Sequence, residues 1–209
     1  MQKHGEVMND SREQIINVAA NLFMQKGYRQ VTMQDIVKAT GLSKGAFYHY
    51  FESKEVVLKE VVKYFFDNNP FYAEDSLVHG ITLKDYCETV IRRISERLER
   101  YEKDISCEDN VLRANQYVLI FDALRILPDF QNHFQSLQQR EFKAWKSVIN
   151  NAIDRQEIFT SLDADIVAKQ FIYLSYGVGI LNVMRDQTAR LILELKEQFF
   201  ALYGTLSKK

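Results

Sequence analysis

Apolar residues recur every three to four positions along nearly the whole chain, and this spacing constrains the fold more than any other feature. It is the repeat of an amphipathic α-helix. The alternation of apolar and polar residues that a half-buried β-strand requires does not extend over any useful length. Two prolines and eight glycines interrupt the 209 residues, so long helices are expected. The sequence therefore predicts an all-α fold.

Local signals place the ends of these helices. Ser11 followed by Gln14 fits a capping box at the start of the first helix, and Gly27 suits its C-terminal end. Thr32 with Asp35 is a second capping box, for a short helix that stops at residues 40–41. A loop is expected over residues 69–80, and prolines 70 and 128 each follow a helical pattern that they should end. The later helices are expected over residues 43–50, 54–68, 82–102, 109–127, 129–155, 164–185 and 187–206.

Charge and cysteine usage indicate an intracellular protein with a mild electrical asymmetry. The formal net charge is −1, but residues 1–66 carry nine Lys/Arg against seven Asp/Glu, and residues 67–209 carry eighteen against twenty-one. Cys87 and Cys107 have neither metal-ligand nor disulfide-framework spacing, so reduced thiols are expected. Residues 1–10 lack the apolar run of a signal peptide, and the uncharged run 170–184 is too short to span a bilayer. We expect a cytoplasmic protein with no membrane partner.

Residues 31–54 contain two short helical patterns joined by a tight turn. Gly41 allows the backbone to take a positive φ there. Ile36, Leu42 and Phe47 are spaced to bury together, and Phe51 can close the cluster. This is helix-turn-helix geometry, in which the second of the two helices keeps one face free for the major groove of DNA.

The free face of that helix carries residues suited to DNA. Lys44 and Tyr48 lie one turn apart, and the small Gly45 and Ala46 permit close approach to base pairs and contact with thymine methyl groups. Lys54 opens the next helix, where backbone amides and a lysine charge can hold a phosphate together. No residue here is informative alone, and the joint spacing is what favours DNA binding over an ordinary solvated surface.

The run TMQDIVKATGLSKGAFYHYFESKE, residues 32–55, resembles the DNA-binding signature of TetR/AcrR-type regulators, and the likeness extends over about residues 11–58. The resemblance implies phosphate contacts from Thr32, Tyr48, Tyr50 and Lys54. It implies contacts with bases or the adjacent backbone from Gln34, Lys44, Gly45, Ala46 and His49. Val37 departs from the family, which more often has alanine there. The resemblance implies a DNA-binding domain over residues 1–53 and a ligand-binding and dimerisation domain over 54–209.

The resemblance over the rest of the chain is one of architecture. Residues 148–180 look like the family's junction between its seventh and eighth helices, but the family often has glycine near the position of Gln156. The last two helices are the expected dimer interface, a four-helix contact with two-fold symmetry that would serve half-sites about 34–36 Å apart. The predicted interface residues are Phe171, Leu174, Val178, Leu181, Leu191, Leu195, Phe199 and Leu202.

A second apolar stripe on the helix over residues 164–185 also needs cover. It consists of Ile166, Tyr173, Ile180 and Met184. The alternative to a dimer interface is that both stripes pack inside one subunit.

The middle of the chain is rich in aromatic residues, which can line a pocket for a small, largely apolar effector. The candidate lining residues are Tyr117, Phe121, Trp145 and Tyr176, and the alternative for each is core packing. Polar residues at nearby helical positions are Asn115, Asp122, Arg125, Glu141 and Asn182. An unknown effector bound there is expected to change the angle between the two DNA-binding heads.

The resemblance implies a ligand-responsive regulator, expected to be a repressor that binds a palindromic DNA operator as a homodimer. The alternative is a regulator or adaptor of the same fold that responds to a protein partner. An enzyme is not expected, because the chain has no Gly-rich phosphate loop and no paired metal-binding motif, and its four histidines are scattered. We therefore predict no catalytic residue, no metal site and no cofactor.

Overall fold

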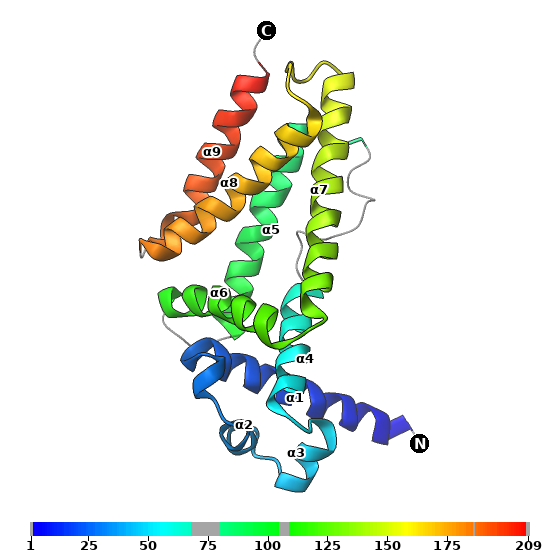
Figure 1. Ribbon diagram of the computed structural model, residues 1–209, viewed down its shortest axis with the longest axis vertical. Helices are drawn as coiled ribbons and strands as arrows, with labels where there is room; N and C mark the ends of the chain where they lie inside the picture. Colours follow the sequence, from blue (N-terminus) through cyan, green and yellow to red (C-terminus); the bar gives the residue numbers. More distant parts are fainter. Residues whose placement is uncertain (1, 68–79, 105–108, 186, 208–209) are drawn as a thin grey trace. The chain divides into compact units, whose positions relative to one another are not determined.

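Figure 1 shows the computed structural model, which describes residues 2–67, 80–104, 109–185 and 187–207. Every secondary-structure element in these ranges is helical, which confirms the predicted all-α class. The chain packs as two compact units. Unit 1 comprises Met1–Asn68 and Glu102–Gln131, and unit 2 comprises Asn69–Tyr101 and Asn132–Lys209.

Unit 1 is built on a long first helix, α1 (Gln2–Lys26), which packs against α2, α4 and α6. Its other elements are η1 (Tyr28–Gln30), α2 (Met33–Thr40), α3 (Lys44–Tyr50), α4 (Lys54–Asp67) and α6 (Asp109–Ile126). The core of the unit is apolar and fully buried around Ile15, Phe23 and Leu58. Burial of side chains of this size is the main favourable term in holding the helices together.

The start of α1 differs from the prediction. The helix begins at Gln2 rather than at Ser11, so Ser11 lies inside the helix and does not cap it. Gln14 Nε2 instead donates a hydrogen bond to the carbonyl oxygen of Thr40, at 3.2 Å, and so ties α1 to the end of α2. The polar residues before Ser11 show no apolar stripe, and the sequence therefore gave no periodic signal for a helix there.

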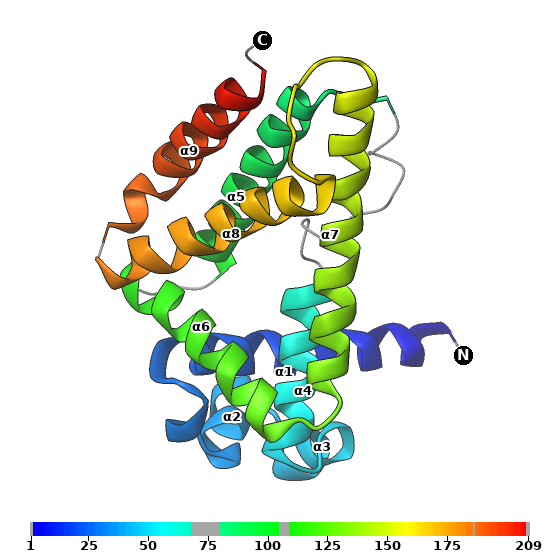
Figure 2. The ribbon, with the colours of Figure 1, turned by 45° about the horizontal axis from the view of Figure 1, so that its top comes forward.

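Unit 2 consists of α5 (Leu83–Asp104), α8 (Ala164–Met184), η4 (Thr188–Arg190), α9 (Leu191–Leu206) and most of α7 (Phe130–Asp154). Figure 2 shows α5 and α8 between α7 and α9. Trp145 is at the centre of the core. Its ring stacks on the Phe171 ring, with 4.8 Å between ring centres. The Tyr86 and Phe199 rings meet it edge-on, with centre-to-centre distances of 4.7 and 5.6 Å. Such aromatic pairs add to the energy of burial itself.

The predicted ends of the later helices are largely confirmed. Thr82 Oγ1 accepts a hydrogen bond from the Asp85 N–H at the start of α5, and α6 ends at Ile126, two residues before Pro128. The last helix is shorter than predicted, because η4 occupies residues 188–190 and α9 begins at Leu191. The expected loop over residues 69–80, Pro70 and Cys107 lie outside the described residues, apart from Gly80.

Gln156 closes the turn after α7 in the left-handed conformation, with a φ of 57°. Its N–H donates to the Ile153 carbonyl at 2.9 Å, and the Glu157 N–H donates to the Ala152 carbonyl at 2.9 Å, which satisfies carbonyls at the helix end. A left-handed conformation normally favours glycine. The glycine-type turn is thus present, formed by a residue with a side chain.

The structural units do not coincide with the functional boundary at residue 53. Both α4 and α6 pack on α1, so unit 1 is larger than the predicted DNA-binding segment and includes residues from the middle of the chain. Contacts between distant segments are decided by tertiary packing, which local periodicity does not encode. The division of function at residues 53 and 54 stays a prediction.

Among the described helices, α8 is long and apolar enough to cross a membrane by length and composition. Part of this apolarity serves the core, where Val167, Phe171 and Val178 are buried. The rest forms an exposed stripe described below. Packing in unit 2 therefore accounts for much of the helix's composition.

Candidate nucleic-acid interface

The helix-turn-helix predicted over residues 31–54 is present, with both short helices capped at their N-termini. Asp35 N–H donates to Thr32 Oγ1 at 3.1 Å, and Thr32 N–H donates to Asp35 Oδ2 at 2.8 Å, which confirms the capping box. These hydrogen bonds from Thr32 lower the pKa of the Asp35 carboxyl. Ser43 Oγ accepts from the Ala46 N–H at 3.2 Å at the start of α3.

The turn and the apolar seam fix α3 against α2. Gly41 follows α2 with a φ of 69°, the left-handed conformation that the sharp turn requires. Ile36, Phe47 and Phe51 are buried as predicted, and Leu42 is half-buried. Because the seam uses one side of α3, its opposite side stays in contact with solvent.

Most of the predicted DNA-contact residues lie on the exposed surface of α2 and α3. The exposed ones are Thr32, Gln34, Lys44, Gly45, Ala46, Tyr48 and His49, and the half-buried ones are Tyr50 and Lys54. Lys44 Nζ lies 5.9 Å from the centre of the Tyr48 ring, so an ammonium and a phenol occupy one patch. This pair presents a positive charge and a hydrogen-bond donor, which are the groups that phosphates bind.

Gly45 has no structural reason within the chain to be glycine. A Cβ placed on it would meet nothing within 4 Å, and its φ is not positive. Glycine inside a helix costs up to about 1 kcal/mol relative to alanine. A small residue kept at an exposed helical position is what a closely approaching partner surface requires.

Two predicted phosphate contacts have their polar groups engaged inside the chain. Lys54 Nζ donates to the carbonyl oxygens of Tyr28 and Val31, at 3.1 and 2.8 Å, and lies 4.2 Å from the Tyr28 ring centre. The Thr32 hydroxyl lies 2.6 Å from Asp35 Oδ2, to which it donates. Lys54 therefore holds the turn at η1 in place, a role that the sequence did not indicate because the lysine is more than twenty residues away.

Most members of the predicted dimer interface are buried within one protomer. Five of the eight residues, Phe171, Val178, Leu191, Leu195 and Phe199, are buried in the core of unit 2 within one protomer. Leu174 and Leu202 are partly buried against the same core, and Leu181 is exposed. The buried side chains pack α8 and α9 against each other and against Trp145. Which residues of α8 and α9 contact a second subunit stays a prediction.

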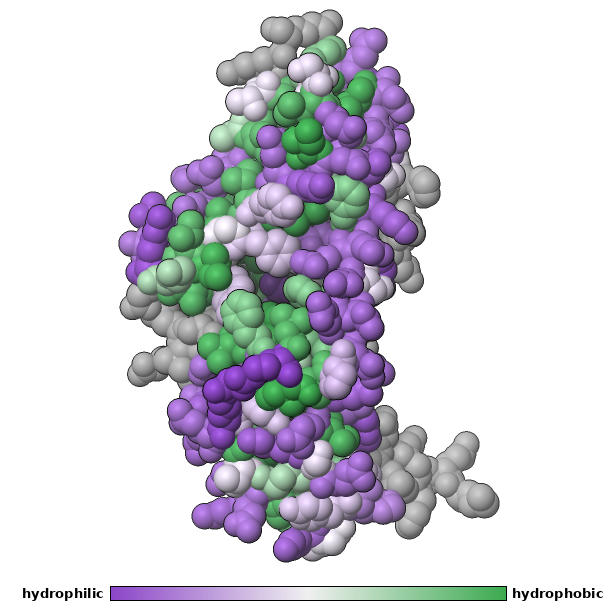
Figure 3. Space-filling view, viewed as in Figure 1, coloured by the Kyte–Doolittle hydropathy of each residue, from purple (hydrophilic) through white to green (hydrophobic). Residues whose placement is uncertain are grey.

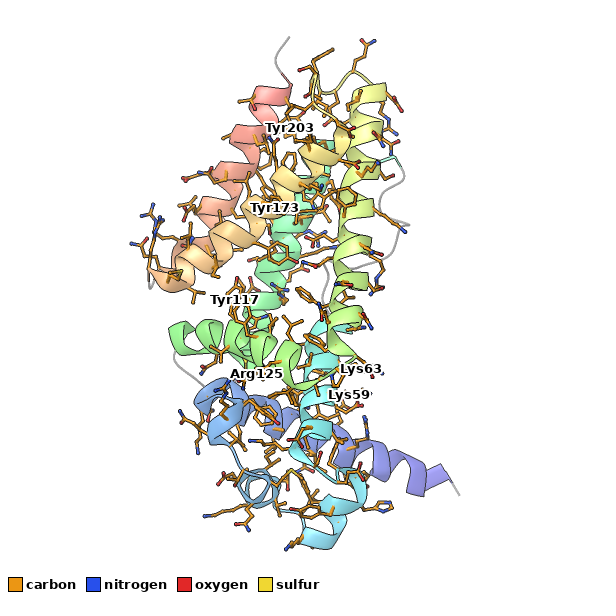
Figure 4. The ribbon with its side chains drawn as sticks, in the orientation of Figure 1. Lys59, Lys63, Tyr117, Arg125, Tyr173 and Tyr203 are labelled. Carbon is orange, nitrogen blue, oxygen red and sulfur yellow. The ribbon has the colours of Figure 1, made fainter. Side chains whose placement is uncertain are left out.

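The second stripe of α8 is the exposed one. Met184 is 75% exposed and Tyr173 is 66% exposed, and Ile166 and Ile180 are also accessible. Apolar and weakly polar residues cover α8 on the face seen in Figure 3, and Figure 4 labels Tyr173 there. The two stripes are similarly apolar, so sequence periodicity alone did not show which one faces outward.

The four candidate pocket residues are divided between the units. Tyr117 and Phe121 lie on α6 in unit 1, where Phe121 is exposed. Trp145 and Tyr176 belong to unit 2, where Trp145 is a core residue with 1% exposure and Tyr176 is exposed. Core packing, the alternative considered for each aromatic residue, applies to Trp145.

The polar residues named from the sequence have distinct partners. Asn115 Nδ2 donates to the Met24 carbonyl at 2.6 Å, and Asn182 Nδ2 donates to Glu194 Oε2 at 2.7 Å. Asp122 accepts from Arg29 and lies 3.5 Å from Arg125 Nη2. Glu141 accepts one hydrogen bond, from the Tyr176 hydroxyl at 3.1 Å. In the described part of the chain, no group of three or more His, Cys, Asp or Glu residues could hold a metal ion.

Comparison with known proteins identifies the N-terminal segment. Residues 15–61 match the family described as bacterial regulatory proteins, tetR family. The HTH-type transcriptional regulator YerO of Bacillus subtilis is 24% identical over 90% of this chain and 63% of its own length. YuxN of the same organism is 45% identical over 29% of this chain and 21% of its length. The chain thus spans less than two thirds of these two relatives.

Other relatives match over more of their length. The HTH-type transcriptional repressor KstR2 of Rhodococcus jostii is 20% identical over 74% of this chain and 71% of its own. A TetR-family regulator from Mesorhizobium loti has a solved structure with a TM-score of 0.68, 20% identity, and coverage of 96% of this chain and 98% of that one. The SmeT–triclosan complex gives a TM-score of 0.66 at 16% identity, covering 96% and 93%.

The sequence signature over residues 32–55, the capped helix-turn-helix and the fold of the solved neighbours all indicate the same kind of DNA-binding segment. Residues 15–61, which contain the helix-turn-helix, thus belong to the tetR family of bacterial regulatory proteins.

Proposed function

We propose that the protein is a cytoplasmic transcriptional repressor that binds a palindromic DNA operator as a homodimer and is released by a small, largely apolar effector. The observation that carries the proposal is the exposed surface of α3, where Lys44 and Tyr48 flank a glycine that the chain itself does not need. A helix with this surface fits the major groove, and the lysine and phenol bind the phosphates beside it.

A dimer follows from the requirement to contact two half-sites. The exposed stripe of α8, with Tyr173, Ile180 and Met184, supplies an apolar surface for it, and Leu193 of α9 is a further exposed apolar side chain of unit 2. Burying these side chains removes apolar area from water, which is the usual driving force for stable dimers. The nearby Gly177 leaves open space where a Cβ would be, so a partner helix can approach closely.

Release by an effector is supported by relatives. KstR2 is named a repressor, and SmeT was solved with triclosan. We carry these properties over to this chain as part of the proposal, with unit 2 as the effector-binding unit.

The test measures binding to duplexes tiled across the upstream region of the gene, at one stated salt concentration, because phosphate-driven affinity depends on salt. Tyr48→Ala and Lys44→Ala are compared with wild type. Lys63→Ala, on the exposed part of α4 in the same unit, is the matched control that removes one charge away from α3 (Figure 4).

We expect specific binding to one near-palindrome, at least tenfold weaker in the two α3 variants and unchanged in Lys63→Ala. Loss of one phosphate contact in Lys44→Ala should also reduce the slope of log K against log salt by about 1. If neither the tiled duplexes nor selection from random sequences yields a site, the DNA-binding proposal is wrong. The alternative of an adaptor with a protein partner would then be preferred.

A further inference from the structure

Glu141 of α7 is a carboxyl group buried in unit 2 with much of its hydrogen-bonding capacity unused. It is 2% exposed. Oε2 accepts a hydrogen bond from the Tyr176 hydroxyl of α8 at 3.1 Å. Oε1 is also buried, and no residue that the structure describes donates a hydrogen bond to it. Buried acceptors are nearly always satisfied in folded proteins, so an open carboxyl oxygen calls for an explanation.

Three helices bring aromatic side chains to this region. Tyr176 contacts the carboxyl directly, and Trp145 lies one helical turn after Glu141 on α7. The Tyr86 ring of α5 meets the Trp145 ring edge-on, with 4.7 Å between ring centres. Burial raises the pKa of the Tyr86 phenol, and the charge of Glu141 raises it further. Aromatic rings beside a carboxylate form the kind of environment in which an organic cation is stabilised.

Burial of Glu141 outweighs the groups that stabilise its charged form. Burial raises the pKa of the carboxyl to about 7, although the hydrogen bond from Tyr176 and the charge of Arg97 both lower it. If this position had only a structural role, a glutamine or leucine would fill it at a lower free-energy cost of removal from water. Acidic groups held in this way are concentrated at functional sites.

We propose that Glu141 Oε1 anchors an effector that carries a protonated amine on an aromatic or aliphatic body. A cationic N–H would satisfy the open acceptor Oε1 with one charge-assisted hydrogen bond. An anionic effector would be repelled by the same carboxylate. This inference rests on the proposed function, because it assigns a chemical class to the effector that unit 2 would sense.

Tyr176 marks the side from which a ligand would reach the carboxyl. Its hydroxyl contacts the buried Glu141 while its residue is 38% exposed, so it extends from the surface of α8 to the acid. A rotation of this side chain, or sharing of its hydrogen bond, would open Glu141 to an amine.

The test uses matched amines and neutral alcohols. Binding of benzylamine, 2-phenylethylamine and tryptamine to the full-length protein is measured by calorimetry and compared with benzyl alcohol, 2-phenylethanol and tryptophol. Trp145 is the only tryptophan of the chain, so its fluorescence reports binding of the phenyl ligands near Glu141. The two indole ligands fluoresce themselves and are followed by calorimetry alone. Glu141→Gln preserves size and removes the charge. Glu197→Gln, on the exposed surface of α9, is the control for loss of one negative charge in the same unit.

We expect at least one amine to bind at least tenfold more tightly than its alcohol, and this preference to disappear in Glu141→Gln but not in Glu197→Gln. Circular dichroism checks that both variants fold. Equal affinity for amines and alcohols, an amine preference that survives in Glu141→Gln, or no binding by any amine would overturn the proposal. The binding measurement with amines contains no DNA, so its result can be interpreted even if the protein binds no operator. If no amine binds, the proposal that the protein binds DNA is unaffected.

Discussion

The carboxylate of Asp122 on α6 accepts hydrogen bonds from the guanidinium of Arg29, whose Nε and Nη2 both lie 3.2 Å from Oδ1. The two residues are 93 positions apart, and the aspartate side chain is only 7% exposed. This contact joins α6 to the short η1 element that leads into the helix-turn-helix. It therefore makes a helix from the middle of the chain part of the support for the DNA-binding surface.

Replacing Asp122 with asparagine should loosen that support. Arg29 is largely exposed and stays hydrated, so the loss is expected to be about 1 kcal/mol in the free energy of unfolding. Urea denaturation measures it, with Asp129→Asn as a control for an exposed aspartate. Equal stabilities for wild type and Asp122→Asn would show that the ion pair contributes nothing.

Substituting alanine for Gly45 should separate stability from DNA binding. The new methyl group meets open space, so α3 should gain up to about 1 kcal/mol of helix stability. The same methyl group should reduce operator affinity at least tenfold if base pairs approach this position. Gly204→Ala, in α9, also fills open space and serves as the control that leaves DNA binding unchanged. Unaltered operator binding in Gly45→Ala would remove the strongest support for close approach at α3.

The oligomeric state should respond to the exposed stripe of α8. Tyr173→Asp places a charge on the proposed contact surface, and sedimentation equilibrium should show a shift from dimer to monomer without loss of helicity. Lys196→Asp, at an exposed position of α9, is the control and should stay dimeric. A dimer that persists in Tyr173→Asp places the contact elsewhere.

Glu141 should make the stability of the protein depend on pH. Its pKa is about 7 in the folded protein and 4.5 when unperturbed, so the folded state binds the proton more tightly. Stability is therefore expected to fall as pH rises from 4.5 to 7, by up to about 3 kcal/mol, and to level off above 7. Glu141→Gln should lack this contribution and be more stable than wild type at pH 8. Urea denaturation across this range measures both effects, and parallel curves for the two proteins would contradict the expectation.

Gln156→Gly should stabilise the turn after α7. A residue with a Cβ is strained at a φ of 57°, and glycine is not, so a gain of about 0.5–1 kcal/mol is expected after the larger entropy of unfolded glycine is included. Gln156→Ala keeps the Cβ and should show no such gain. Thermal unfolding distinguishes the two, and a stability ranking with alanine above glycine would be contrary to the strain argument.

Features encoded over a few residues were predictable from the sequence. The Thr32–Asp35 capping box, the turn at Gly41 and the burial of Ile36 and Phe47 all depend on neighbours within one or two helical turns. The all-α class and most helix ends follow from periodicity for the same reason. Because the DNA-binding signature is a local pattern of this kind, the residues on the surface of α2 and α3 could be named in advance.

Tertiary structure decided whatever depends on which surfaces meet. The two stripes of α8 are equally apolar, and packing against α9 and Trp145 buried Phe171 while leaving Tyr173 exposed. Lys54 donates to a carbonyl oxygen of η1, which lies more than twenty residues earlier in the chain. Glu141 is buried by packing between helices, and its Oε1 has no hydrogen-bond donor among the described residues. Burial and hydrogen bonding of this kind are properties of the assembled core, and a local pattern holds no information about the partner that a side chain will meet.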